Sequence, residues 1–305
     1  MGLLSGSASV TRFNVLSRPE EPDFELGAFR EIPRGTEVRE RAGFVPFEPE
    51  APYRVGQNRL AFRVRIDTLR PDPTRVKERL KELEKTEKDA TGAGFVPSKK
   101  RRRLRELAEE EMLSQAAPTS RVIECCLEDR VLYVGTTANT HLGLVLGLAR
   151  LVGIDATFKA PWIDRDEPEA SSPLVEAAGP GQSVLGCRFL RVLLADSDLV
   201  YEPETGSVAL RAPDARVTLA GAVIPEVHRY VDRGAEILSA KLLMDDVSFR
   251  LDGLSFRVGA LRIETERFDS WIEQLDARLE RIVAVYDVLD AKYAELSASL
   301  QAMEA

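Results

Sequence analysis

The C-terminal segment 266–305 carries the pattern that most constrains the fold. Large apolar residues recur there at alternating spacings of four and three: Phe268, Ile272, Leu275, Leu279, Ile282, Tyr286, Leu289, Tyr293, Leu296, Leu300 and Met303. A heptad seam of this length predicts one long helix with a narrow apolar stripe, which favours a helical partner. That partner lies either in the same chain or in a second subunit. In the second case we expect the dimer contacts at Ile272, Leu275, Leu279, Ile282, Tyr286 and Leu289.

The rest of the chain mixes strand and helix patterns. In Leu60–Ile66 every second residue is large and apolar, the period that marks a half-buried strand. Glu128-Asp129-Arg130 is a turn between two strand-like runs, which predicts a hairpin. Other strands are expected at 8–16, 122–127, 131–136, 184–194, 208–210, 217–223, 237–244, 247–251 and 254–263, and helices at about 73–91, 98–114, 139–152 and 226–232. This order predicts an α/β protein of the α+β type, with mixed or antiparallel sheets and long helices.

Composition along the chain suggests four consecutive segments. Residues 1–163 form an α/β region with a basic helix, and residues 164–183, rich in Pro, Glu, Ser and Gly, form an exposed connection. Residues 184–265 are rich in β patterns. Residues 266–305 form the heptad helix, the expected dimerisation element.

The overall composition bounds the class of protein. With 44% hydrophobic and 30% charged residues, the chain has a globular composition. No apolar run approaches the roughly 20 residues that span a bilayer, and the N-terminus lacks the pattern of a secretory signal. Three cysteines, two of them adjacent, do not make a disulfide framework. We therefore expect a cytoplasmic protein with no membrane partner.

One basic segment contrasts with the acidic total. The formal net charge is −8, which by itself disfavours a nucleic-acid partner. Six of the seven residues from Lys99 to Arg105 are nevertheless cationic. They occupy the first turns of the helix expected at 98–114, with Ser98 as its N-cap, where the helix dipole disfavours positive charge. Glu109–Glu111 crowd the other end, again with the unfavourable sign.

A charge distribution that costs local stability without helping the fold indicates an anionic partner, most simply a phosphate backbone. Pairs such as Arg102–Glu106 give only partial relief, because each contributes a few tenths of a kcal/mol. The nearby strand Leu60–Ile66 could extend the cationic surface. The expected DNA contacts are Lys99, Lys100, Arg101, Arg102, Arg103 and Arg105, supported by Arg63 and Arg65.

The histidines and cysteines do not form a catalytic or metal-binding pattern. His141 and His228 each lack a second ligand at metal-site spacing. Cys125 and Cys126 are adjacent on a strand and so point to opposite faces, and Cys187 lies in an apolar run. We expect no catalytic residue, metal ion or cofactor.

Two weaker signals leave small alternatives open. Gly135–Asn139 leads into a helix and could bind an anion, but it lacks the Walker lysine and the dinucleotide glycines, so a helix cap is favoured. Thr137 or Asn139 is the expected cap. The carboxylate pairs Asp245/Asp246 and Asp164/Asp166 could bind magnesium in a nuclease, although both fall at expected turns.

The order of several short motifs resembles the RdgC family of bacterial recombination-associated DNA-binding proteins. The similarity covers most of the chain and is weak from Asp164 to Val223. It rests on the strand Ala8–Val15, the run Ala42-Gly43-Phe44-Val45-Pro46, the strand Leu60–Ile66, the helical stretch Leu83-Glu84-Lys85-Thr86-Glu87-Lys88-Asp89, the hairpin Val122–Thr136, the meander Ala240–Ile263 and the C-terminal helix.

The resemblance implies a ring-shaped homodimer with duplex DNA in a positively charged hole. It also implies little sequence preference, nucleoid association and restraint of a RecA-type recombinase. Two features depart from the family. An aromatic residue of the family's DNA-contacting tip is missing where this chain has Pro118-Thr119-Ser120-Arg121, and the heptad seam is longer and stricter.

We therefore expect sequence-independent DNA binding, most simply to duplex DNA, by a non-catalytic homodimer. The first alternative is an oligomeric interaction or scaffold protein, in which the heptad helix recruits a partner and the basic run is ordinary surface. A metal-dependent exonuclease is the less favoured alternative.

Overall fold

The computed structural model describes residues 2–33, 38–167, 170, 172–175, 181–195, 200–202, 206–221 and 224–302. The strands are β1 (Ala8–Ser17), β2 (Glu40–Val45), β3 (Arg54–Val55), β4 (Arg59–Thr68), β5 (Thr119–Glu128), β6 (Val131–Val134), β7 (Asp155–Phe158), β8 (Val200–Tyr201), β9 (Ser207–Arg211), β10 (Arg216–Ala220), β11 (Glu236–Met244), β12 (Val247–Asp252) and β13 (Arg257–Leu261). The helices are α1 (Pro73–Thr91), α2 (Ser98–Ser114), α3 (Asn139–Leu151), α4 (Pro161–Asp164), α5 (Leu185–Val192), α6 (Ile224–Asp232) and α7 (Trp271–Ala302), with short 3₁₀ turns η1 (Phe24–Gly27) and η2 (Leu193–Ala195).

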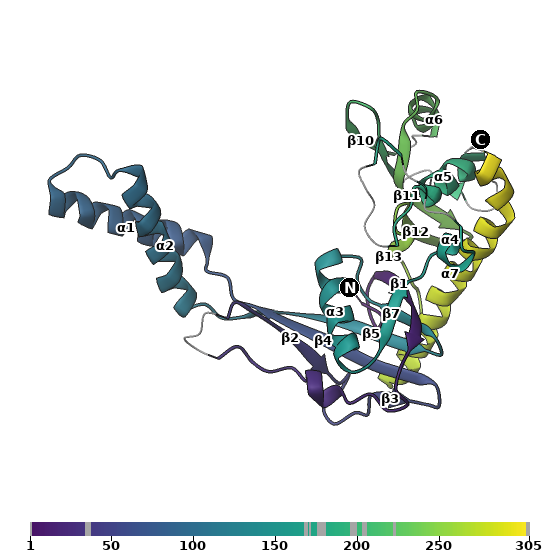
Figure 1. The fold of residues 1–305 in the computed structure, drawn as a ribbon, viewed down its shortest axis with the longest axis horizontal. Helices are drawn as coiled ribbons and strands as arrows, with labels where there is room; N and C mark the ends of the chain where they lie inside the picture. Colours follow the sequence, from purple (N-terminus) through teal and green to yellow (C-terminus); the bar gives the residue numbers. More distant parts are fainter. Residues whose placement is uncertain are drawn as a thin grey trace. The chain divides into compact units, whose positions relative to one another are not determined.

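These elements form an α+β fold, as the sequence predicts (Figure 1). The strands follow the hydrogen-bonded order β10-β9-β11-β12-β13-β1-β6-β5-β4-β2, with β3, β7 and β8 paired at its sides. The expected hairpin is β5–β6, in which Cys125 pairs with Val134 and Glu128 with Val131. The expected meander is β11–β12–β13. Hydrogen bonding is antiparallel between these successive strands, which is the arrangement that short turns allow.

The chain divides into two compact units, each built from segments distant in sequence. Unit 1 contains Met1–Leu26, Pro46–Arg63 and Ile123–Ala305, and unit 2 contains Gly27–Val45 and Val64–Val122. The units therefore do not follow the four consecutive segments expected from composition.

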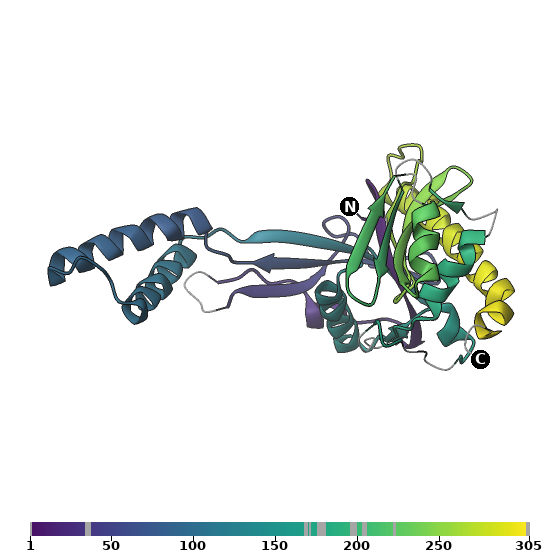
Figure 2. The same ribbon diagram turned by 90° about the horizontal axis from the view of Figure 1, so that it is seen from above.

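In unit 1, α5 and α7 lie on one face of the sheet around β11, β12 and β13 (Figure 2). The seam of α7 packs into the core of its own unit and is not a free surface. Leu275, Leu279, Ile282, Tyr286 and Leu289 are each at most 1% exposed, and Ile272 is half-buried. The expected use of these five buried residues as a dimer interface is therefore wrong, because the chain itself covers them, whereas the expected role of the half-buried Ile272 stays a prediction. Leu300 and Met303, at the end of the seam, lie outside the residues whose side chains are described.

The strand expected at 184–194 is instead the helix α5. Leu185, Phe189 and Leu193 repeat every four residues and are buried, whereas Arg188 and Arg191 take more exposed positions. A short, nearly continuous apolar run fits a buried strand or a buried helix equally well, which is why the pattern misled. Cys187, which lies in this apolar run, is buried on the helix.

The connection expected at 164–183 is only partly exposed. Ser183 is fully buried, and Glu167 accepts a hydrogen bond of 2.9 Å from the Tyr293 hydroxyl. Residues 168, 169, 171 and 176–180 lie outside the described part of the chain, as do Ala222 and Val223 of the strand expected at 217–223. Among the described helices, none is both long and apolar enough to cross a membrane.

Unit 2 contains a helical hairpin formed by α1 and α2 (Figure 1). Asp72 caps α1 by accepting a hydrogen bond from the Thr74 amide, and Gly92 ends it with a positive φ of 65°. Val76 of α1 and Ala108 of α2 are buried. Ser98 is the first residue of α2 and not its N-cap; Pro97 precedes the helix and offers no side-chain acceptor. The cap expected at Ser98 is therefore wrong.

Candidate nucleic-acid interface

The basic segment lies in the first turns of α2, and all six of its cationic side chains are exposed. Four of them have glutamate partners. The pairs are Lys100–Glu87 at 3.4 Å, Arg101–Glu84 at 2.6 Å, Arg102–Glu106 at 3.1 Å and Arg105–Glu109 at 2.9 Å. Within the described residues, Lys99 and Arg103 make no ion pair.

The cross-hairpin pairs change the electrostatic argument made from the sequence. Glu84 and Glu87 project from α1 and offset charges that looked unsupported within α2 alone. Each such exposed pair contributes about 0–1 kcal/mol, so it compensates the dipole cost without fixing the arginines firmly. The case for an external anion must therefore rest on the cations that remain unpaired.

The acidic end of α2 is also partly compensated. Arg79 of α1 donates to Glu111 at 2.6 Å, and this guanidinium lowers the pKa of the Glu111 carboxyl below its ordinary value. Glu109 is held by Arg105. Ion pairs thus join α1 to α2 along the hairpin, and they favour the antiparallel packing of the two helices.

A second cationic feature lies on α1. Its lysines recur at spacings of four, four and three and so share one face of the helix: Lys77, Lys81, Lys85 and Lys88. We call these four residues the lysine stripe. All four are exposed, none has an ion pair within the described residues, and the stripe extends about 16 Å at 1.5 Å per residue.

Three of the five carboxylates of α1 are used in other ion pairs, and the other two, Glu78 and Asp89, make no ion pair within the described residues. Glu84 and Glu87 bind arginine and lysine of α2, and Glu82 binds Arg79 at 2.9 Å. From Pro73 to Ser114 the hairpin has twelve lysine and arginine residues against nine aspartate and glutamate residues, a net charge of +3, whereas the whole chain carries −8. The sequence analysis missed the stripe, although the spacing of its lysines was a usable signal.

Arg63 and Arg65 are not available as free supporting contacts. Arg63 donates to the Pro46 carbonyl at 2.7 Å, and its guanidinium lies 5.5 Å from the centre of the Phe47 ring. Arg65 makes a double hydrogen bond with Asp67 at 2.8 and 2.9 Å. The expected supporting role of both arginines in DNA contact is therefore unsupported, since both fix local structure.

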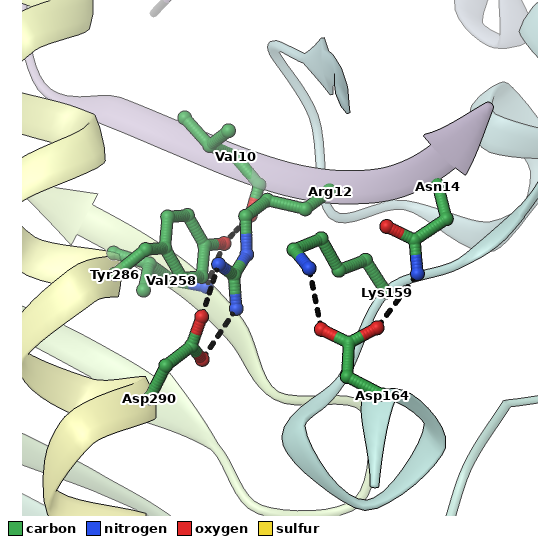
Figure 3. A network of polar contacts seen from close by, with 8 residues as sticks. All are labelled: Val10, Arg12, Asn14, Lys159, Asp164, Val258, Tyr286 and Asp290. Carbon is green, nitrogen blue, oxygen red and sulfur yellow. Dashed lines mark hydrogen bonds and ion pairs between the residues drawn. The ribbon is translucent and has the colours of Figure 1, made fainter. Parts of the chain in front are cut away.

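Unit 1 contains a buried polar network that joins β1 to α7 (Figure 3). The Arg12 side chain is 3% exposed and donates twice to Asp290, at 2.7 and 2.8 Å. The Tyr286 hydroxyl donates to the Val10 carbonyl at 2.8 Å and accepts from the Val258 amide at 3.2 Å. Burial raises the pKa of Tyr286 to about 12, so it remains a donor at neutral pH. These hydrogen bonds all join parts of the fold to one another, and Arg12 Nε is buried without a hydrogen-bond partner among the described residues. The network is therefore structural.

The possible magnesium ligand Asp164 is used within the fold, and the adjacent cysteines are buried. Asp164 binds Lys159 and accepts a hydrogen bond from Asn14 at 2.7 Å (Figure 3). Burial raises the pKa of Cys126 to about 12 and that of Cys125 well above its ordinary value, which disfavours the reactive thiolate. Across the described ranges, no three His, Cys, Asp or Glu side chains are grouped to hold a metal ion.

The loop Gly135–Asn139 leads into α3 as expected, but without the expected cap. Ala138 precedes the helix, and the Thr136 hydroxyl accepts from the Ala138 amide at 3.2 Å. Arg257 donates to the Thr137 carbonyl at 2.9 Å and to Asn139 Oδ1 at 2.6 Å. These contacts tie the loop to β13.

Comparison of the sequence with models of known protein families gave no match, and comparison with curated protein sequences gave none either.

Proposed function

We propose that this protein binds DNA without sequence preference through the α1–α2 hairpin, and that it does so without catalysis. The observation that carries the proposal is the lysine stripe, four exposed cations on one helix face of an acidic chain, none of which has an ion pair within the described residues. Charges of this kind contribute little to folding, whereas a phosphate backbone gains from each of them through release of counterions.

The wider arrangement of charge supports the same partner. Lys99 and Arg103 add two cations on α2 that have no ion pair in the part of the chain that the structure describes. The first amides of α2 lack a side-chain cap, so they add positive partial charge. The negative charge of the rest of the chain repels phosphate, which directs an anionic polymer to the hairpin. Five of these six cations are lysines, whose compact point charge suits contact with phosphate, so we infer binding to the backbone.

The resemblance to the RdgC family adds a further part to the proposal. By that resemblance the protein acts as a ring-like homodimer on duplex DNA in the nucleoid and restrains strand exchange by a RecA-type recombinase. The buried seam of α7 is not the interface of such a dimer. A different surface would have to form it.

Salt-dependent binding tests the proposal. Fluorescence anisotropy with a labelled random-sequence duplex should give a slope of log K against log salt of about −5 if six phosphates are neutralised. The variant K77Q/K81Q/K85Q/K88Q should reduce the size of that slope by about 3 to 4 and weaken binding equally for two unrelated sequences.

A control variant with the same change in net charge is available in unit 1. Arg130, Arg262, Arg267 and Arg281 are exposed and make no ion pair within the described residues. The variant R130Q/R262Q/R267Q/R281Q should keep the wild-type slope. No binding to either duplex, or equal losses in the two variants, would contradict the proposal.

A further inference from the structure

The connection between α1 and α2 exposes an aromatic ring that the DNA-backbone contacts leave unexplained. Phe95 is 72% exposed, the largest value among the large hydrophobic side chains of the described residues. Phe268 of unit 1 is exposed to 39%. A single exposed hydrophobic side chain is common in itself. What distinguishes Phe95 is its high exposure together with its place between two cationic helix ends.

The residues next to Phe95 in the chain have free space around them. Gly92 and Gly94 precede it, and a Cβ added at either would meet no atom within 4 Å. Pro97 follows and is exposed. A flat ligand can therefore approach the ring without displacing the chain.

The charges on either side of Phe95 indicate what kind of ligand fits. Lys88 lies in the last turn of α1 and Lys99 in the first turn of α2, and both are exposed and unpaired within the described residues. A partner for this connection must combine a flat apolar face with negative charge. A nucleotide has both, because its base stacks on aromatic rings and its phosphate attracts lysine.

We propose that Phe95 stacks against an unpaired nucleobase while the cations of the α1–α2 hairpin hold the adjoining phosphates. This inference rests on the proposed DNA binding and adds to it a preference for DNA that contains single-stranded or unstacked bases. In intact duplex the bases are already stacked and paired, so Phe95 contributes little there.

Tryptophan fluorescence at position 95 tests the stacking. The two native tryptophans, Trp162 and Trp271, both belong to unit 1, so the F95W signal is obtained by subtracting the wild-type spectrum. We expect single-stranded oligothymidine to quench the emission of F95W, because a stacked base quenches indole. F268W is the matched control and should keep its emission.

Affinity provides a second measurement. F95A should weaken binding to oligothymidine by about 5- to 150-fold, the range for loss of one stacked base, with little change for a fully paired duplex. F95L keeps the apolar character but not the aromatic face, so it should resemble F95A. F268A should bind like the wild type.

The possible failures can be told apart. If wild-type protein binds oligothymidine but F95W is not quenched, the stacking inference fails while DNA binding stands. If neither duplex nor single strand binds, both proposals fail. Quenching by polyphosphate, which has no bases, or a blue shift on vesicles of anionic phospholipid without any response to DNA, would also overturn the stacking inference.

Discussion

Replacing Tyr286 by phenylalanine is the sharpest test of how unit 1 is held together. The Tyr286 hydroxyl joins the Val10 carbonyl of β1 to the Val258 amide of β13, close to the point where the pairing of these strands shifts register. Phenylalanine keeps the ring, which lies 3.8 Å from the Arg12 guanidinium, and removes only the hydroxyl. The change therefore isolates two hydrogen bonds.

The expected magnitude follows from the groups left behind. Val10 and Val258 are fully buried, so water cannot replace the lost partner. An unsatisfied buried donor or acceptor costs about 1–3 kcal/mol. Allowing for some relaxation around the small cavity, Y286F should lower the free energy of unfolding of unit 1 by about 2–4 kcal/mol.

Urea unfolding followed by tryptophan fluorescence measures this loss directly, because both tryptophans belong to unit 1. The transition should move to lower urea with an unchanged slope. Y230F is the control, since the half-buried Tyr230 hydroxyl makes no hydrogen bond within the described residues, and it should change stability by less than about 0.5 kcal/mol. A similarly small effect of Y286F would refute the bridging role.

Two further predictions concern glycine packing and pH. A Cβ at Gly186 of α5 would overlap the Gly253 carbonyl, so G186A should destabilise unit 1 by about 3 kcal/mol. At Gly147, in the interior of α3, a Cβ would meet no atom, so G147A should stabilise unit 1 by about 0.5–1 kcal/mol. Urea unfolding that showed the same sign for both variants would contradict the packing. Hydrogen bonding to Arg65 lowers the pKa of Asp67, so this carboxylate stabilises unit 2 above about pH 4 and the contribution is lost as pH falls through the lowered pKa. A ¹³C titration of the Asp67 carboxyl should have its midpoint below about 3.9, and D67N should flatten the acid limb of the thermal stability profile; a midpoint at or above that value would be inconsistent with the pair.

Local patterns predicted the elements of this fold well. The heptad spacing predicted α7, and Asp72 followed by Pro73 predicted the start of α1. Short turns predicted the hairpin β5–β6 and the meander β11–β13. Each of these features depends on residues within a few positions of one another.

The errors arose where distant segments decide the outcome. The partner of the α7 seam was ambiguous in the sequence, because the spacing is the same whether the seam meets its own core or a second subunit. The pairing of Arg101 with Glu84 depends on the register of α1 against α2, which neither helix shows alone. The apolar run of α5 fitted strand and helix alike, and its packing against the backbone at Gly253 involves a segment more than 60 residues away.

The central position of β1 also has a consequence for folding during synthesis. This strand pairs on one side with β6 and on the other with β13, which begins about 250 residues later at Arg257. At roughly 5–20 residues per second, a ribosome needs about 12–50 s to produce that interval. The Ala8–Val10 end of β1 therefore remains without its native partner for most of translation, whereas Phe13–Ser17 can pair with β7 once residue 158 has been made. For this protein, protection of an early strand by a chaperone would be most useful before the late segments arrive.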